Sequence, residues 1–298
     1  MPAGNITFIA LAILYLGALL WIGLQARKQS RDEAGFFLAG RRLGISSTTA
    51  TLTATSVGGS ATILVIGVVY TSGLPFIWTD IAGGLGLILL GLFLARRVRE
   101  MDCFSLPEIA GIFYGGAVRR IAAILVFIAE LGFLALLLRG AAGMLQPMFE
   151  MQYDIALIAI GAIFIIYTVV GGQTAVARTD ALQLVVMAVG LVALLFFTYA
   201  NPTALDRAPG GHFSFPASEA FPPLSVLSLA FIAGLPHLVG SDIYAKVLSA
   251  RDGDAAAKAS VLSGFLKIAV GIGVGLIGLA AAGILPAGLA QETVLGNL

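Results

Sequence analysis

Long apolar stretches recur along the entire chain, and no other feature limits its fold as strongly. A bilayer core about 30 Å thick is crossed by about 20 helical residues. Eight stretches are long and apolar enough for this, near residues 6–24, 46–70, 76–95, 121–145, 155–170, 181–200, 224–247 and 259–285. Lipid offers backbone groups no hydrogen bonds, and runs such as 156–170 lack strict alternation, so we predict helices rather than barrel strands.

The composition agrees with a membrane protein and excludes several other classes. Hydrophobic residues make up 59% of the 298 residues and charged residues 11%, whereas soluble domains carry roughly 25% charged residues. We therefore predict an all-α integral membrane protein that forms a single membrane domain over residues 1–298. Residues 1–5 carry no Lys or Arg, so the stretch from residue 6 is expected to be a retained span rather than a cleaved signal peptide.

Few residue types in the chain could support an enzyme or a nucleic-acid-binding protein. A net charge of +1 gives no electrostatic reason to expect nucleic acid as a partner. The single cysteine, Cys103, allows no internal disulfide framework. The two histidines do not have the spacing of metal ligands, and the sequence contains no nucleotide-binding glycine motif. We therefore expect neither enzymatic activity nor a cofactor.

Basic residues gather on alternate connections between the predicted spans. Fourteen of the 17 Lys and Arg residues fall on one side. Only Arg207 falls on the other side, and Arg139 and Lys267 lie within spans. Basic loops face the cytoplasm, so the pattern predicts a multi-pass protein of the cell membrane with its N-terminus outside. The fourteen are Arg27, Lys28, Arg31, Arg41, Arg42, Arg96, Arg97, Arg99, Arg119, Arg120, Arg178, Lys246, Arg251 and Lys258.

Two of the predicted spans are unusual for membrane helices. In residues 46–62, twelve of seventeen residues are Ser, Thr or Gly, and the span at 224–247 contains Gly234 and Pro236 near its middle. Broken helices of this kind, five spans apart and opposite in direction, are typical of inverted-repeat transporters, which bind solute and ions between them. The alternative is that the small residues only allow close helix packing.

Three stretches of the sequence resemble the sodium/solute symporter family, the relatives of the sodium–proline, sodium–pantothenate, sodium–sialate and sodium–glucose transporters. They are FFLAGRRLG at 36–44, YTVVGGQTAVARTDALQ at 167–183, and AKVLSARD at 245–252 followed by GFLK at 264–267. The resemblance implies a peripheral helix at 6–24, a first five-helix repeat at 46–200 and the first two helices of an incomplete second repeat at 224–285. Family members carry further helices, so we expect residues 1–298 to need missing C-terminal helices or self-association before they can carry out coupled transport.

The family resemblance also implies a sodium site at the first broken span. The backbone carbonyls of Ala54 and Val57 match ligands of the conserved sodium ion, and Ser56 beside them could add a hydroxyl. Asp180, at the predicted start of the sixth span, matches a carboxylate near a second cation position or the inner gate. The alternative for Asp180 is a helix N-cap.

The residues expected to contact a solute follow partly from the resemblance. Others are charged residues within predicted spans, where a charge costs free energy and therefore indicates a functional role. Trp78 and Asp80 lie on a helix that contacts the solute in the family, and Lys267 matches a family lysine that is expected to pair with a carboxylate. Gly234 and His237 lie at the second broken span. Arg139 either clamps a solute carboxylate or extends to the membrane surface. The GxxxG spacing at Gly271 and Gly275 predicts helix packing.

These observations together predict a sodium-coupled symporter that moves a small polar solute, such as an amino acid or an organic acid, by alternating access. Its partners are then the lipid bilayer, the solute and sodium as the coupling ion. The alternative, from another class, is a non-transporting membrane module, either a sensor or an assembly subunit.

Overall fold

A computed structural model of the chain describes residues 14–15, 17–19, 21–26, 32–149, 151–201, 204 and 206–298. These residues form helices and one isolated parallel bridge between Leu43 and Ala250, and no β-strand occurs among them. Five helices are long and apolar enough to cross a membrane, and one bent helix pair would make a sixth span. The all-helical membrane fold predicted from the sequence is therefore confirmed.

A helix lies at each of the eight predicted spans, but the helices at the first and fifth spans are shorter than a full membrane span. Shorter apolar helices, Gly17–Ala26 and Tyr153–Ile166, lie where the first and fifth spans were predicted. Residues 6–13 of the first span lie outside the described residues. The longer elements are α2 (Glu33–Leu38), α3 (Ile45–Val57), α4 (Gly59–Ser72), α5 (Trp78–Leu89), α6 (Ala95–Glu100), α7 (Leu106–Tyr114), α8 (Gly116–Phe149), α9 (Tyr153–Tyr199), α10 (Pro223–Val239), α11 (Ser241–Leu248) and α12 (Gly253–Ile284).

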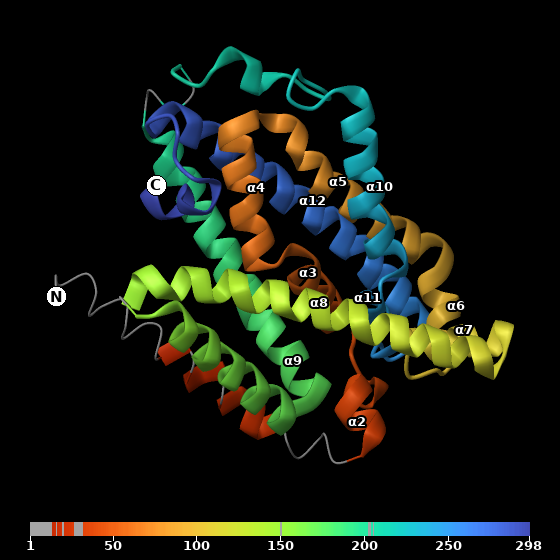
Figure 1. The fold of residues 1–298 in the computed structure, drawn as a ribbon. Coiled ribbons are helices and arrows are strands. Elements are labelled where there is room, and N and C mark those ends of the chain that lie inside the picture. Colours follow the sequence, from red (N-terminus) through yellow and green to blue (C-terminus); the bar gives the residue numbers. More distant parts are fainter. Residues whose placement is uncertain are drawn as a thin grey trace.

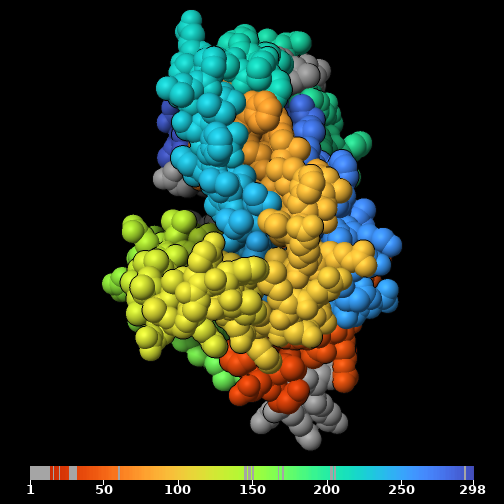
Figure 2. Space-filling view, turned by 90° about the vertical axis from the view of Figure 1, so that its right-hand side faces the viewer, coloured from red at the N-terminus to blue at the C-terminus, as the bar shows by residue number. Residues whose placement is uncertain are grey.

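Helices α5 and α12 form the centre of the bundle. A π-helical turn, η4 (Leu90–Leu94), joins α5 to α6 in one long span. In its most apolar stretch, 56% of α12 is buried, compared with none of α8 or α10. Helix α12 packs against α3, α4 and α5, and α10 lies along α5 above α7 and α8 (Figure 2). The exposed faces of α8 and α10 are apolar, as expected of helices that meet lipid.

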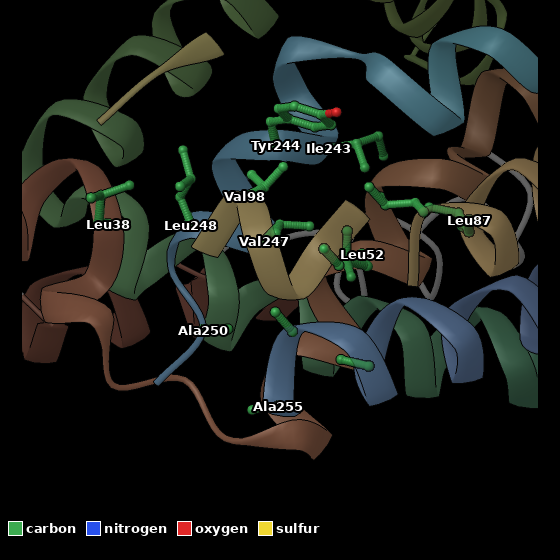
Figure 3. Close-up of a cluster of buried hydrophobic side chains, with 14 of the residues drawn as sticks. Leu38, Leu52, Leu87, Val98, Ile243, Tyr244, Val247, Leu248, Ala250 and Ala255 are labelled. Atoms are coloured by element: carbon green, nitrogen blue, oxygen red, sulfur yellow. The ribbon is translucent and has the colours of Figure 1, made fainter. Parts of the chain in front are cut away.

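A cluster of buried side chains holds the basic end of the bundle together. It brings Leu38 of α2, Leu52 of α3, Leu87 of α5 and Val98 of α6 against the apolar side of α11, at Ile243 and Val247 among others (Figure 3). Nearby, Asp252 caps α12 by accepting a hydrogen bond from the Ala255 N–H at 2.7 Å, and this bond lowers the pKa of the Asp252 carboxyl. The loops with most of the basic residues therefore adjoin a tightly packed apolar cluster.

The two ends of the bundle differ in charge as the sequence predicts. Helices α2, α6 and α7 and the turn between α11 and α12 lie at one end, while the connection from α9 to α10, with Arg207, lies at the other (Figure 1). The alternation of basic loops predicted along the sequence is thus a separation in space. Which end faces the cytoplasm stays a prediction.

The fifth and sixth predicted spans are not separated by a loop, and this part of the prediction is wrong. Helix α9 runs from Tyr153 to Tyr199 and bends at Gly172, whose φ of 55° is unfavourable for other residues. A Cβ atom at Gly172 would lie 2.8 Å from the Phe36 carbonyl oxygen, so glycine also allows α2 to approach the bend. The chain turns at one residue and needs no loop.

The first break was predicted correctly, and the second lies further along the chain than expected. Helices α3 and α4 meet at Gly58 with a bend of 47°. The second break is not at Gly234 or Pro236, because α10 continues through both and ends at Val239. Proline removes one helical hydrogen bond and crowds the preceding turn, yet the helix continues past Pro236, whose carbonyl accepts the Gly240 N–H at 2.7 Å. The extended backbone of Gly240, with ψ of 144°, separates α10 from α11.

Candidate functional site

The first broken span exposes backbone groups in the interior of the bundle. Gly58, with φ of 49° and ψ of 133°, leaves the helical conformation between α3 and α4. Its N–H still reaches the Ala54 carbonyl at 3.3 Å, and its own carbonyl accepts the Thr62 N–H at 3.1 Å. Polar backbone at membrane depth needs a partner, so the groups that face this break are the first place to look for a site.

Lys267 of α12 and Asp80 of α5 meet at this break. The Lys267 Nζ lies 2.6 Å from the Ser56 carbonyl oxygen and 2.9 Å from the Asp80 Oδ1. Only 4% of the Lys267 side chain and 14% of the Asp80 side chain are exposed. The pairing of Lys267 with a carboxylate, predicted from the sequence, is confirmed. A buried ammonium requires such partners, because transfer of an unpaired charge from water is very costly.

His237, in the last turn of α10, faces the same place. Its Nδ1 is hydrogen-bonded to the Ala233 carbonyl at 2.7 Å, and its ring interacts with the Ser56 backbone and the Lys267 charge. A Cβ atom at Gly83 would lie 2.4 Å from Lys267 Cε and 3.0 Å from His237 Cε1. Gly83 therefore lets both side chains converge. Ser56, Asp80, His237 and Lys267 are called the central cluster below.

A second buried polar group lies where α3, α9 and α11 meet, further from the break. Asp180 accepts a hydrogen bond from the Thr51 hydroxyl, and the Lys246 Nζ of α11 lies 3.9 Å from its Oδ2. All three residues are buried. The predicted N-cap role of Asp180 is wrong, because α9 already begins before the bend at Gly172 and continues through this residue.

Lys246 was missed as a site residue, because its place near the end of a span suggested a cytoplasmic loop. Only the spacing of Asp242 and Lys246, four residues apart on one helix face, could have indicated a buried pairing. The negative charges of Asp180 and Asp242 both favour the charged ammonium form of Lys246.

Three of the predicted solute contacts lie away from the central cluster. The Trp78 indole N–H donates to the Pro216 carbonyl at 3.1 Å, and the ring stacks on Phe215 with centroids 5.5 Å apart. Trp78 thus contacts the α9–α10 connection. Gly234 packs on α5, where a Cβ atom would lie 3.3 Å from the Ala82 oxygen. Arg139 is exposed on α8 and forms no ion pair with a described residue.

The surroundings of the predicted sodium ligands contain unused oxygen atoms. The hydroxyls of Thr49 and Thr53 are buried and have no hydrogen-bond partner in the described part of the chain. Thr53 directly precedes Ala54, and Val57 ends α3 at the break. The Ser56 hydroxyl, in contrast, donates to the Thr53 carbonyl at 3.0 Å. Thr49 also lines a cavity of about 640 Å³ between α3, α9 and α12.

The fold and these two polar groups define a multi-pass membrane protein whose polar interior lies beside two broken spans. Comparison with known proteins identifies its family. The model of the sodium:solute symporter family matches residues 36–297, and the chain belongs to this family. The family and the relatives below are transporters rather than enzymes.

Two curated relatives are named as choline transporters. The human high affinity choline transporter 1 is 27% identical over 288 residues, which are 91% of this chain and 49% of the relative. The Drosophila melanogaster high-affinity choline transporter 1 is 27% identical over 199 residues, 67% of this chain and 32% of the relative. The chain spans about half the length of the human relative and about a third of the Drosophila relative.

A solved structure confirms the fold. A substrate-bound, outward-open Na+-coupled sialic acid symporter superposes with a TM-score of 0.82 at 20% identity. The match covers 96% of this chain and 64% of that structure.

Proposed function

We propose that the protein works as a sodium-coupled symporter of a small polar solute that carries a carboxylate, such as an amino acid or an organic acid. The observation that carries this proposal is the buried central cluster between two broken spans. Membership of the sodium:solute symporter family supports the sodium coupling. The chain spans about half the length of the human choline transporter. The proposal therefore concerns the complete carrier of which these residues form a part.

The proposed sodium position uses the carbonyl oxygens of Ala54 and Val57. A hard cation needs several oxygen ligands, and the unpaired Thr53 hydroxyl supports this location. Asp180 would supply a carboxylate one turn away, beside Thr51. The Ser56 hydroxyl is a weaker candidate, since it is already bonded to the Thr53 carbonyl.

The proposed solute position lies against the central cluster, with Asp80, His237 and Lys267 as contacts. Gly234, Trp78 and Arg139 remain candidates from the sequence that lie away from this cluster. Lys267 is paired with Asp80, so the pair has no net charge, but its ammonium keeps an N–H donor that a carboxylate can accept and a quaternary ammonium group cannot. The cluster therefore favours an acidic or zwitterionic solute over a quaternary ammonium, although the two curated relatives are named for choline. In this proposal the basic end of the bundle faces the cytoplasm of the cell.

Uptake driven by a sodium gradient tests the proposed function. The protein is expressed from its own gene in a host without sodium-coupled uptake of the tested solutes, and amino acids, organic acids, sugars and choline are compared. We expect uptake of a carboxylate-bearing solute that disappears when external sodium is replaced by N-methyl-D-glucamine. Uptake that persists without sodium would reject the symport, and the absence of uptake of any solute would favour the non-transporting membrane module.

Arg139 allows the charge of the solute to be tested. Arg139→Lys keeps the positive charge but loses the planar, two-pronged geometry that binds a carboxylate. If Arg139 faces the solute, we expect the affinity for the transported acid to fall by about 1–3 kcal/mol. The exposed Arg207→Lys variant in the opposite loop is the matched control, and the concentration dependence of uptake is the measurement. Unchanged affinity would show that Arg139 extends to the membrane surface.

A further inference from the structure

The Ser56 carbonyl and the Asp80 carboxylate form a pair of oxygen atoms suited to a cation. One is a backbone oxygen at the break of α3, and the other is a charged oxygen on the neighbouring α5. Carbonyls freed by a broken helix and carboxylates are the usual ligands of hard cations in membrane proteins. This pair is distinct from the Ala54 and Val57 carbonyls to which the sodium ion is assigned above.

Lys267 already occupies this oxygen pair. Its Nζ lies 2.6 Å from the Ser56 oxygen and 2.9 Å from the Asp80 Oδ1, both within the range of charge-assisted hydrogen bonds. The side chain is 96% buried, since only 4% of it is exposed. A sodium ion on the same two oxygens would lie beside the ammonium and be strongly repelled by it.

The second buried lysine does not fill its site in the same way. The Lys246 Nζ lies 3.9 Å from the Asp180 Oδ2, which is beyond hydrogen-bond distance. Asp180 therefore keeps oxygen lone pairs for another partner, whereas Asp80 directs an oxygen at an ammonium in hydrogen-bond contact. The ammonium is 1 Å further from Asp180 than from Asp80, so Asp180 still has room for a cation and Asp80 does not.

We infer that the Lys267 ammonium is a tethered cation that takes the place of a sodium ion at the break of the first broken span. An ammonium has three N–H donors, and Ser56 and Asp80 accept two of them. The third is left for the solute. The inference goes beyond the proposed function, because it sets the number of sodium ions at the central cluster to zero.

Removing the ammonium should convert the oxygen pair into a sodium site. Lys267→Met keeps an unbranched side chain that is one atom shorter, and it leaves the Ser56 carbonyl and the Asp80 carboxylate free. The purified protein in lipid nanodiscs is unfolded by heat in sodium chloride and in N-methyl-D-glucamine chloride at equal ionic strength. We expect sodium to raise the unfolding midpoint of Lys267→Met by several degrees more than that of the wild type, because a ligand that binds only the folded state stabilises it.

Two matched variants make the result specific. Lys258→Met removes an exposed lysine from the same helix and should respond to sodium as the wild type does. Asp80→Asn combined with Lys267→Met removes the charged oxygen and should lose the additional sodium response. An equal sodium response in Lys267→Met and wild type would reduce Lys267 to a structural ion pair and overturn the inference, as would a gain that survives Asp80→Asn.

A folding defect of the lysine variants also gives an answer. If Lys267→Met or Lys267→Gln folds only when sodium is present during purification, sodium replaces the missing ammonium and the inference is supported. If both variants fail to fold in either salt, sodium cannot take that position and the inference is rejected. Ion-dependent unfolding is the readout throughout, so a failure here is separate from a failure of sodium-driven uptake.

Discussion

Replacement of Lys246 by methionine is expected to lower the free energy of unfolding by a large fraction of its total. In the part of the chain that the structure describes, the variant leaves the buried Asp180 with the Thr51 hydroxyl as its remaining side-chain partner. Loss of one member of a buried ion pair costs about 3–5 kcal/mol, because the remaining charge stays uncompensated. A domain is stable by only about 5–15 kcal/mol, so this is a large fraction of the total. Unfolding midpoints and the yield of monodisperse protein in detergent measure the effect.

The double variant identifies the cause of that loss. Asp180→Leu combined with Lys246→Met removes both charges and should recover most of the stability, since well-packed apolar residues often replace a buried pair without cost. Lys258→Met, which removes an exposed charge, should change little. Stability of the Lys246→Met variant equal to that of the wild type would mean that the 3.9 Å contact contributes nothing and that Asp180 is satisfied by other groups.

The fold could be predicted from the sequence because the bilayer imposes a length on each helix. Hydrophobic length and the alternation of basic loops gave the helical class, and the Ser, Thr and Gly content of α3 gave the first break. The second break was misplaced because proline can lie inside a membrane helix whose surroundings compensate for the lost hydrogen bond, as Pro236 does in α10, while Gly240 is one glycine among 37. Local composition does not show which glycine takes an extended conformation.

The central cluster could be predicted only in part. Asp80 and Lys267 were both expected near a solute, and Lys267 was expected to meet a carboxylate, but 187 positions separate them in the sequence. Their contact depends on how closely α5 and α12 cross, which one sequence does not reveal. The contact of Lys267 with the Ser56 carbonyl was not predicted, since a backbone oxygen leaves no signature in the side-chain sequence.

The crossing of α5 and α12 explains why Lys267 can reach Asp80. A Cβ atom at Gly264 would lie 2.5 Å from the Gly84 carbonyl oxygen, and one at Gly271 would lie 2.3 Å from the Asp80 Cβ. Gly275 similarly packs on Ile77, so the packing role predicted for the GxxxG spacing is confirmed. The glycines bring the two backbones together one turn on either side of the ion pair.

Gly264→Ala is therefore expected to damage both the packing and the central cluster. The added methyl group would meet the backbone of α5, which cannot move aside as a flexible side chain can. Overpacking costs about 1–3 kcal/mol and occasionally more, and contact with backbone puts this variant at or above about 3 kcal/mol. The unfolding midpoint should fall well below that of Gly132→Ala, the matched control on α8, where a Cβ atom would meet nothing within 4 Å. If Gly264→Ala unfolded at the same temperature as Gly132→Ala, the two helices could not cross this closely, and the short contact between Lys267 and Asp80 would lose its structural basis.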